Sequence, residues 1–467
     1  MSSERFSTLL RISQYVPEIS SPSRKPALKI RLLWTLLILV IYLSMGFVPL
    51  YRVTVSAQAL PLYQIIFAAQ QGTLTSLGIG PIVTGGLLAE ILIGSDLIRL
   101  DFSKPEDRSA FTAMVKVFTL AFIVVESVAY TVGMLGFYYH VPASALPIDA
   151  LQLILAGFVV YMLDQAIQKG WGVGSGVSLF ILANVALIVM VDLFNPVKVA
   201  GEYFGLVPFL VQAALSGDVW RAVVRANGYP SLVGLGATVG FVLLLIYLEG
   251  IRIEVPVASS QYRGITGTYP IKLLYVSNVP VILVGALLAN FQILTSWWAS
   301  WARTSGAWYA AALAQYNAQG QLVGGLLYYL IGPQDLQQAI ADPLLTVIFV
   351  VIMTLLSTAF AVVWVEMSGM SAEKAADSLV KAQVAIPGFR STRSTVGRVL
   401  GRWIPTVTLL GGAIVGIIAG VSQFLGVFGG GIGLLLMVDI AIQYYQQLVQ
   451  EELEFIMPRL AGIFGRR

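Results

Sequence analysis

Ten apolar runs follow one another along this chain of 467 residues. A helix needs about 20 apolar residues to cross the hydrocarbon core of a bilayer, and each run comes close to that length. With 57% apolar and only 11% charged residues, the chain lies outside the range of soluble domains. The sequence therefore predicts an all-α polytopic membrane protein, with transmembrane helices at 32–50, 74–94, 111–138, 148–167, 175–195, 232–250, 273–294, 343–365, 403–424 and 431–449.

Lysine and arginine indicate the orientation. Residues 1–30 are polar and basic, so we expect no cleavable signal peptide before the first run. With the N-terminus in the cytoplasm, the 28 Lys and Arg residues all lie on that side except Arg52, Lys198, Arg221, Arg225 and Arg303. Cytoplasmic loops of membrane proteins carry such an excess. We expect a multi-pass protein of the cell membrane with both termini in the cytoplasm.

The runs divide into two sets of five. An odd number of spans per half means that the second half starts on the opposite side of the membrane, as in an inverted repeat. We predict a cytoplasmic N-terminal segment, a first half, an external linker, a second half and a cytoplasmic tail, at residues 1–31, 32–195, 196–231, 232–449 and 450–467.

The region 60–94 is too long for one span. As a single helix it would measure about 50 Å at 1.5 Å per residue, and Gln70, Gln71 and Gly72 interrupt it. We interpret 60–71 as a half-helix that enters from the external side without crossing. Broken backbone at membrane depth is tolerated where protein or a water-filled cavity surrounds it. A kinked helix packed through small residues is an equally good reading of this stretch alone.

Two basic loops face the cytoplasm. In 251–271, apolar residues alternate with Arg252 and Glu254, which predicts a strand. In 366–402, a candidate amphipathic helix precedes a Pro-Gly break and a run of arginines. Membrane topology alone accounts for such loops, and a phosphate-bearing partner is the functional alternative.

Several strings carry a family resemblance. They include GIGPIVTGGLLAEILIGSDLI, GWGVGSGVSLFI, RIEVPVASSQYRG, GTYPIKLLYVSNVPVIL, IPGFR and GVFGGGIGLLL. Together they resemble the SecY family, the channel-forming alpha subunits of the Sec translocon, and are most similar to archaeal and eukaryotic members. The match runs nearly from end to end. The resemblance implies a clamshell of two halves around an hourglass pore, which an external plug closes and which opens sideways to lipid.

The resemblance also implies roles for individual residues. A ring of aliphatic side chains forms the pore constriction, for which ordinary helix packing is the alternative reading. A polar cluster lies at the lateral gate, and the half-helix is the plug. Matched to this sequence, the pore ring is Ile79, Val83, Val177, Ile181, Ile282 and Leu436; the gate cluster is Thr84, Glu126 and Asn290; and the plug residues are Leu62, Ile65, Ile66, Phe67, Gln70 and Gln71. Asp439 matches no family position, and its partner is not predicted.

The implied function is passage of unfolded secretory polypeptides across the membrane and lateral release of transmembrane segments into lipid. The implied partners are SecE-like and SecG/Sec-beta-like single-span subunits in a heterotrimer, a ribosome touched through its RNA, signal peptides and nascent chains, membrane lipid, and the signal recognition particle receptor. Candidate ribosome contacts are Arg252, Arg263, Arg390, Arg393 and Arg398.

Enzyme chemistry is not expected. The chain has no cysteine and one histidine, His140, and we find no phosphate-binding glycine motif and no catalytic triad. We therefore expect no cofactor and no metal. The competing classes are a secondary transporter, which would need charged groups at the membrane midplane, and a scramblase or scaffold, which gives no reason for the half-helix.

Overall fold

The computed structural model describes residues 16–24, 26–53, 68–94, 97–98, 100, 104–138, 141–199, 201–225, 229–259, 266–274, 276, 280, 283–285, 287–288, 291, 295, 298, 310–316, 322–333, 335–368, 370–381, 384–385 and 392–464. In this part of the chain, eight helices are long and apolar enough to cross a membrane. The predicted run 74–94 adds a shorter apolar helix. The run 273–294 lies largely outside the described residues, so the count of ten stays a prediction.

The first half consists of helices. They are α2 (Leu28–Met45), α4 (Gly80–Gly94), α5 (Pro105–Ala129) with the π-helix η1 (Tyr130–Tyr138), α6 (Leu146–Ala166) with the π-helix η2 (Ile167–Trp171), and α7 (Gly176–Phe194). The region after α7 contains the strands β1 (Lys198–Val199) and β2 (Glu202–Tyr203), the helix α8 (Leu206–Ser216) and the 3₁₀ turn η3 (Val219–Ala222). The predicted linker 196–231 is therefore a folded unit.

The second half mixes long helices with short elements. The long helices are α9 (Leu232–Gly250), α14 (Pro343–Met367), α16 (Arg393–Phe424) and α17 (Gly431–Phe464). The short elements are β3 (Arg252–Ser259), β4 (Thr266–Lys272), α11 (Ala310–Leu313), β5 (Gln315–Tyr316), β6 (Leu322–Gly324), α12 (Leu326–Ile331), α13 (Leu336–Ala341), α15 (Ala372–Lys381) and β7 (Val384–Ala385).

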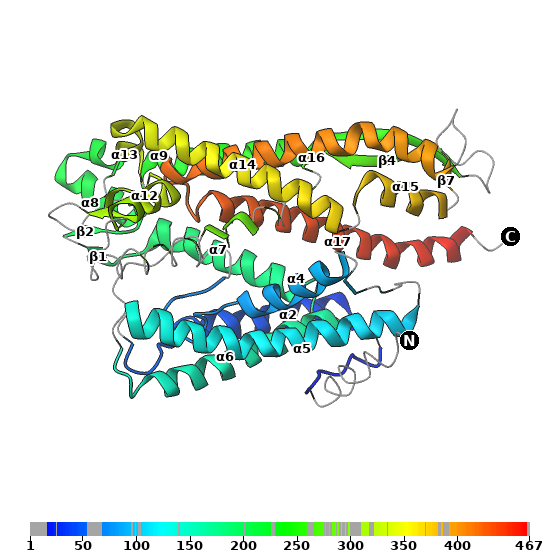
Figure 1. Cartoon of the computed structure of the whole chain (residues 1–467), viewed down its shortest axis with the longest axis horizontal. Coiled ribbons are helices and arrows are strands. Elements are labelled where there is room, and N and C mark those ends of the chain that lie inside the picture. Colours follow the sequence, from blue (N-terminus) through cyan, green and yellow to red (C-terminus); the bar gives the residue numbers. More distant parts are fainter. Residues whose placement is uncertain are drawn as a thin grey trace.

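The long helices run side by side along the longest axis of the molecule (Figure 1). Helices α2, α4, α5 and α6 form one side, and α9, α14 and α16 form the other. Helices α7 and α17 lie between the two sides and contact each other. The two predicted halves are thus spatially distinct, with α7 and α17 as the seam between them.

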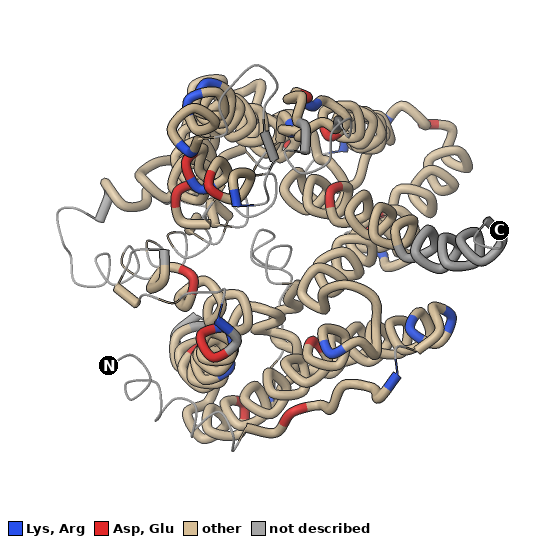
Figure 2. Tube along the Cα trace, turned by 90° about the vertical axis from the view of Figure 1, so that its right-hand side faces the viewer, with Lys and Arg blue, Asp and Glu red and all other residues tan. Residues whose placement is uncertain are grey.

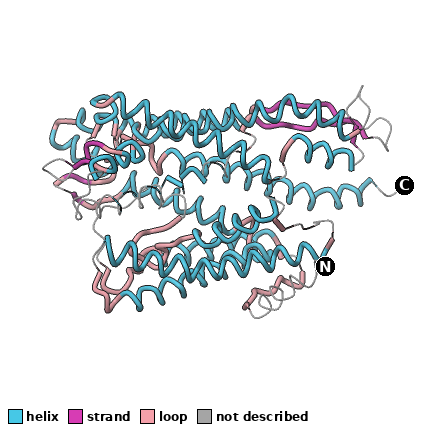
Figure 3. The backbone as a smooth tube through the Cα atoms, in the orientation of Figure 1, coloured by secondary structure: helices cyan, strands magenta, loops and turns pink. Residues whose placement is uncertain are grey.

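The two ends of the molecule differ. Strands β3 and β4 and helix α15 lie at one end, whereas α8, β1, β2, α12 and α13 lie at the other (Figures 1 and 3). We call the first the hairpin end and the second the linker end. The two basic loops predicted from the sequence thus contribute their described elements to the same end of the molecule.

The most extensive helix contact in the second half is between α14 and α16. Small residues at every fourth position of α16 make it possible. A Cβ atom on Gly412 or Gly416 would lie 2.9 Å or 2.5 Å from backbone atoms of α14. Small residues allow helices to approach closely in membranes, where no hydrophobic force draws them together.

The hairpin end confirms both secondary-structure predictions for the basic loops. Strands β3 and β4 pair in antiparallel register from Arg252↔Lys272 to Ala258↔Thr266, and β7 pairs with the far end of β3. Helix α15 packs on α16. The apolar cluster beneath them contains Val255, Ile271, Ala376, Val396 and Leu400.

Two predicted helix starts were wrong. Helix α16 begins ten residues before the predicted 403, because Val396, Leu400 and Ile404 repeat every fourth residue and are buried against α15 and the hairpin. Helix α17 continues to Phe464, and the part of it that is apolar enough to cross a membrane, Gly431–Gln450, agrees with the predicted span 431–449. Helix α4 begins at Gly80, and residues 68–79 are turns rather than helix.

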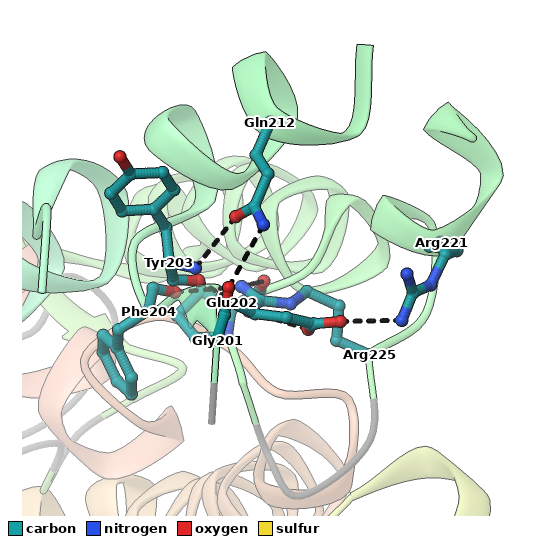
Figure 4. A network of polar contacts seen from close by, with 8 residues as sticks. Gly201, Glu202, Tyr203, Phe204, Gln212, Arg221 and Arg225 are labelled. Atoms are coloured by element: carbon teal, nitrogen blue, oxygen red, sulfur yellow. Dashed lines mark hydrogen bonds and ion pairs between the residues drawn. The ribbon is translucent and has the colours of Figure 1, made fainter. Parts of the chain in front are cut away.

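The linker is organised around one buried arginine, Arg225 (Figure 4). Its guanidinium group donates to the carbonyl oxygens of Tyr203 at 2.7 Å, Phe204 at 2.9 Å and Pro230 at 3.1 Å. It also lies 3.8 Å from the centre of the Phe209 ring. Burial lowers the pKa of Arg225, and Glu202 beside it acts in the opposite direction.

We expect Arg225→Met to destabilise the linker. Methionine fills similar space but leaves three carbonyl groups without their donor, at about 1–3 kcal/mol for each group that stays buried and unpaired. The matched control is Arg221→Gln, since Arg221 is exposed and pairs only with Glu202 at 2.7 Å. Exposed ion pairs contribute little. Arg225→Met alone should lower the temperature of thermal unfolding and speed protease cleavage within 196–231. Equal unfolding temperatures and cleavage rates for the two variants would contradict this role of Arg225.

Candidate functional site

One apolar cluster, mostly aliphatic but including the rings of Tyr42, Phe180 and Phe349, draws on both halves. Its buried side chains include residues of α2, α6, α7, α9, α14, α16 and α17 and also Ile79, directly before α4. Five of the six predicted pore-ring residues belong to it: Ile79, Ile181 and Leu436 are buried, and Val83 and Val177 are half-buried against them. Ile282 lies outside the described residues. Residues that are distant in the sequence thus meet in one apolar cluster.

Local backbone structure explains how α4 presents its two residues. Gly78 has a positive φ of 52° and ends the preceding turn. The Ile79 carbonyl oxygen then accepts from the Val83 N–H at 3.1 Å, which is the first helical hydrogen bond of α4. Ile79 and Val83 therefore lie on one face, as their i,i+4 spacing predicts.

The start of α7 is tied to both neighbouring helices. The Asp164 carboxylate on α6 accepts from the Val177 N–H at 3.1 Å and from the Gln168 side chain at 2.8 Å. The Tyr444 hydroxyl on α17 donates to the Ser175 carbonyl and accepts from the Ser175 N–H, both at 2.8 Å. Gly174, at φ 75°, lies against the Tyr444 ring, where any larger side chain would overlap it.

The linker end of the same seam is tied in a similar way. The Gly429 N–H, in the turn between α16 and α17, donates to Asp192 of α7 at 3.2 Å. The Phe428 N–H donates to the Thr238 hydroxyl of α9 at 2.9 Å. Helices α7 and α17 are thus joined by polar contacts at both ends, while Ile181 and Leu436 are apolar contacts between those ends.

Residues 68–79, which precede α4, form a buried turn region. The Tyr42 hydroxyl donates to the Ala68 carbonyl, and its ring stacks on Phe180 at 4.2 Å. The Gly72 N–H donates to the Tyr130 hydroxyl at 3.4 Å. Protein therefore surrounds the break that the sequence predicted at Gly72, and the break starts α4 as a separate helix rather than kinking a longer one.

The predicted plug is described only at its C-terminal end. Gln70 is half-buried and Gln71 is buried, and residues 68–71 are turn rather than helix. Positive φ angles at Ala68 (49°) and Gly72 (77°) are incompatible with continued helix. Leu62, Ile65, Ile66 and Phe67 lie outside the described residues.

Two of the three predicted gate residues lie together. The Thr84 side chain of α4 lies near the Glu126 carboxyl group on α5, and its hydroxyl donates to the Gly80 carbonyl at 3.0 Å. Helix α4 packs closely on α5 at Gly85, which follows Thr84. A Cβ atom on Gly85 would lie only 2.7 Å from the Thr119 backbone nitrogen. Asn290 lies outside the described residues.

Asp439 has a partner that the sequence did not predict. The Gln443 side chain donates to it at 3.1 Å, and the Glu249 carboxyl group of α9 lies beside it. Lys272, at the end of β4, pairs with Glu249 at 3.2 Å. Both carboxyl groups are buried. A buried charge cluster thus joins the hairpin, α9 and α17.

Three of the five candidate partner-binding arginines are described, all at the hairpin end. Arg252 pairs with Glu254 at 3.2 Å and stays 60% exposed. Arg393 lies 3.9 Å from Glu373, and Arg398 lines the same open depression between α15 and α16. Figure 2 looks onto this end and shows Lys and Arg segments beside Asp and Glu segments. Arg263 and Arg390 lie outside the described residues.

The arrangement defines a class of protein. Within the described residues, no group of three or more His, Cys, Asp or Glu side chains could hold a metal ion. The centre between the two halves is apolar, and the polar contacts lie towards the ends of the seam. A membrane protein whose two halves meet through apolar side chains, with polar contacts at the ends of the seam, has an arrangement that suits a channel.

Comparison with known proteins identifies the family. The SecY family model matches residues 73–445. The protein translocase subunit SecY of Aeropyrum pernix is 38% identical over 98% of both chains. The Sec61 alpha subunit of Dictyostelium discoideum is 35% identical over 96% of this chain and 97% of its own.

Solved structures agree. A structure described as a protein conducting channel has a TM-score of 0.75 at 31% identity, covering 97% of this chain and 99% of its own. Sec61 from a canine ribosome–channel complex has a TM-score of 0.73 at 30% identity, with the same coverage. The chain belongs to the SecY family. It is a channel subunit of a protein translocase and not an enzyme.

We expect Gly85→Ala to weaken the packing of α4 on α5. The added methyl group would meet backbone atoms of Thr119, which cannot move aside as a side chain can. The neighbouring Gly86→Ala is the control, because its Cβ would have nothing within 4 Å, and alanine is favoured over glycine in helices by up to about 1 kcal/mol. The midpoint temperature of thermal unfolding in detergent should fall for Gly85→Ala and be unchanged or rise for Gly86→Ala. The reverse order would contradict the packing described here.

Proposed function

We propose that the apolar cluster containing Ile79, Val83, Val177, Ile181 and Leu436 is the resting seal of this channel. Unfolded secretory polypeptides would cross the membrane through it, and transmembrane segments would leave it sideways into lipid. The observation that carries the proposal is that α4, α7 and α17, from both halves, contribute these residues to one cluster. An aliphatic constriction excludes ions by dewetting and makes no bond that a passing chain must break. Ile282 is the sixth member of the proposed ring.

The direction of opening follows from where the halves are tied. Ser175–Tyr444 and Asp192–Gly429 hold α7 to α17 at both ends. The halves therefore part most easily on the opposite side, where α4 contacts α14 across the seam. We place the lateral gate there, with Thr84 and Glu126 on the first half and Asn290 on the second.

The proposed plug, 60–71, ends within the buried turn region 68–79. Tyr42 and Tyr130 hold this turn region between α2 and η1. A fixed attachment at the C-terminal end of the plug would let the plug leave and return to the same place. The family resemblance and the burial of residues 68–79 support this proposal.

We place the protein in the cell membrane with both termini in the cytoplasm. The hairpin and α15 lie at one end of the molecule (Figure 1), and the Lys and Arg pattern of the sequence favours the cytoplasm for these loops. The canine Sec61 relative was solved in a ribosome–channel complex. By analogy, we propose SecE-like and SecG/Sec-beta-like subunits, nascent chains and a ribosome as partners of this chain.

The seal can be tested by hydrating it. Replacing Ile79, Ile181 and Leu436 together by serine should give a resting ion conductance in planar bilayers that the parent lacks, because hydroxyl groups stabilise water in the constriction. The control is the same change at Leu33, Leu36 and Val40, which are exposed on α2. A conductance equal to that of the control variant would remove these residues from the seal, provided that both variants unfold at similar temperatures.

Ribosome contact can be tested through its dependence on salt. Arginine that neutralises RNA phosphate releases counterions, so each lost contact should lower the slope of log affinity against log salt by about one. We expect weaker binding and a smaller slope for Arg252→Glu with Arg398→Glu. Arg221→Glu at the linker end is the control. Cosedimentation with ribosomes in detergent measures both quantities, and unchanged binding would leave these arginines with a role in topology only.

A further inference from the structure

Helix α8 carries an apolar stripe on its exposed face. Its opposite face is buried, with Leu206, Phe209 and Ala213 packed against η3 and α9. The eleven residues of α8 include no charged side chain. The stripe consists of Val207 (40% exposed), Val211 (57%) and Leu215 (86%), and it continues into η3 with Val219 (46%) and Trp220 (85%).

The spacing makes these residues one surface. Val207, Val211 and Leu215 are each four residues apart, so they lie in a row along the helix. Gly217, at φ 77°, ends the helix, and Val219 and Trp220 follow directly. An uncharged helix with a contiguous exposed apolar stripe marks an interaction surface rather than a solvated one.

The stripe continues an exposed apolar surface of α7, a helix long and apolar enough to cross a membrane. Met190 and Phe194, near the end of α7, are each 54% exposed, and Val197 beyond it is 57% exposed. Helix α8 packs on α7, and the Gly205 N–H just before α8 donates to the Asn195 carbonyl just after α7 at 3.0 Å. The stripe therefore begins where the exposed apolar surface of α7 ends.

We infer that α8 and η3 lie in the membrane interface at the linker end, with Val207, Val211 and Leu215 at the acyl boundary and Trp220 among the headgroups. Tryptophan is enriched at this level of the bilayer. Burial of apolar surface is the main driving force, because α8 has no basic residue and the one basic residue of η3, Arg221, is paired with Glu202 at 2.7 Å. The inference rests on the proposed membrane topology.

The consequence concerns the connection between the halves. The linker joins α7 to α9, and Arg225 holds its strands, α8 and η3 together. With α8 in the interface, this unit is held at a fixed depth. The halves would then pivot about a point anchored in lipid at the same end as the Asp192–Gly429 contact.

The absence of cysteine from the parent allows a direct test. A nitroxide label is placed at one of Val211→Cys, Leu215→Cys or Trp220→Cys in the full chain, in nanodiscs of phosphatidylcholine with or without phosphatidylglycerol. Electron spin resonance measures how often the label collides with oxygen and with a water-soluble nickel chelate. Phe194→Cys is the lipid-facing control, and Lys198→Cys, exposed on β1 of the same linker, is the aqueous control.

We expect Val211→Cys and Leu215→Cys to behave like Phe194→Cys, accessible to oxygen and shielded from nickel, and Trp220→Cys to be intermediate. Phosphatidylglycerol should make no difference. Nickel access equal to that of Lys198→Cys would overturn the inference in favour of water. Shielding from both reagents would overturn it in favour of a protein partner or a second copy. The channel proposal is judged separately, because resting conductance of the unlabelled variants reports on the seal and not on α8.

Discussion

The fold depends on one constraint, that backbone polar groups inside a membrane must find partners within the protein. The chain breaks its helices at three glycine-rich places, residues 68–79, 170–176 and 426–430, and each break is bonded by side chains of neighbouring helices. Tyr42 and Tyr130 serve the first, Asp164 and Tyr444 the second, and Asp192 and Thr238 the third. At 68–79, which is buried between α2 and η1, these polar groups take the place of water, whereas the other two breaks lie at the two ends of the α7–α17 seam.

The breaks also position the proposed constriction. Ile79 and Val177 stand directly at the start of helices that follow a break, and Leu436 lies little more than one turn into another. Three helices therefore meet in the apolar cluster close to their first turns. The polar contacts between α7 and α17 lie towards the ends of their seam, away from Ile181 and Leu436. A closed channel built in this way separates structural hydrogen bonds from the surface that must open.

Much of this could be predicted from the sequence because it depends on local pattern. Apolar run length located the long helices, alternation located β3, and the resemblance placed five residues in one cluster. The length of the apolar run did not predict where α16 begins. Arg398 and Arg402 interrupt the run, but Val396, Leu400 and Ile404 continue the helix. The partners of Asp439 and Arg225 could not be predicted, because Glu249, Lys272 and the carbonyl groups of the linker approach them only in the folded chain.

The charge cluster at Asp439 shows which half can move. Separating Lys272, whose side chain is 40% exposed, from Glu249 would leave a buried carboxyl group without its partner. The hairpin, α9 and α17 are therefore held as one body, and Leu436 lies one turn from Asp439 within it. Helix α4 is held differently, by close packing at Gly85, the Thr84–Glu126 contact and the apolar cluster. Opening thus costs least if α4 and α5 move away as a pair while α17 keeps its position.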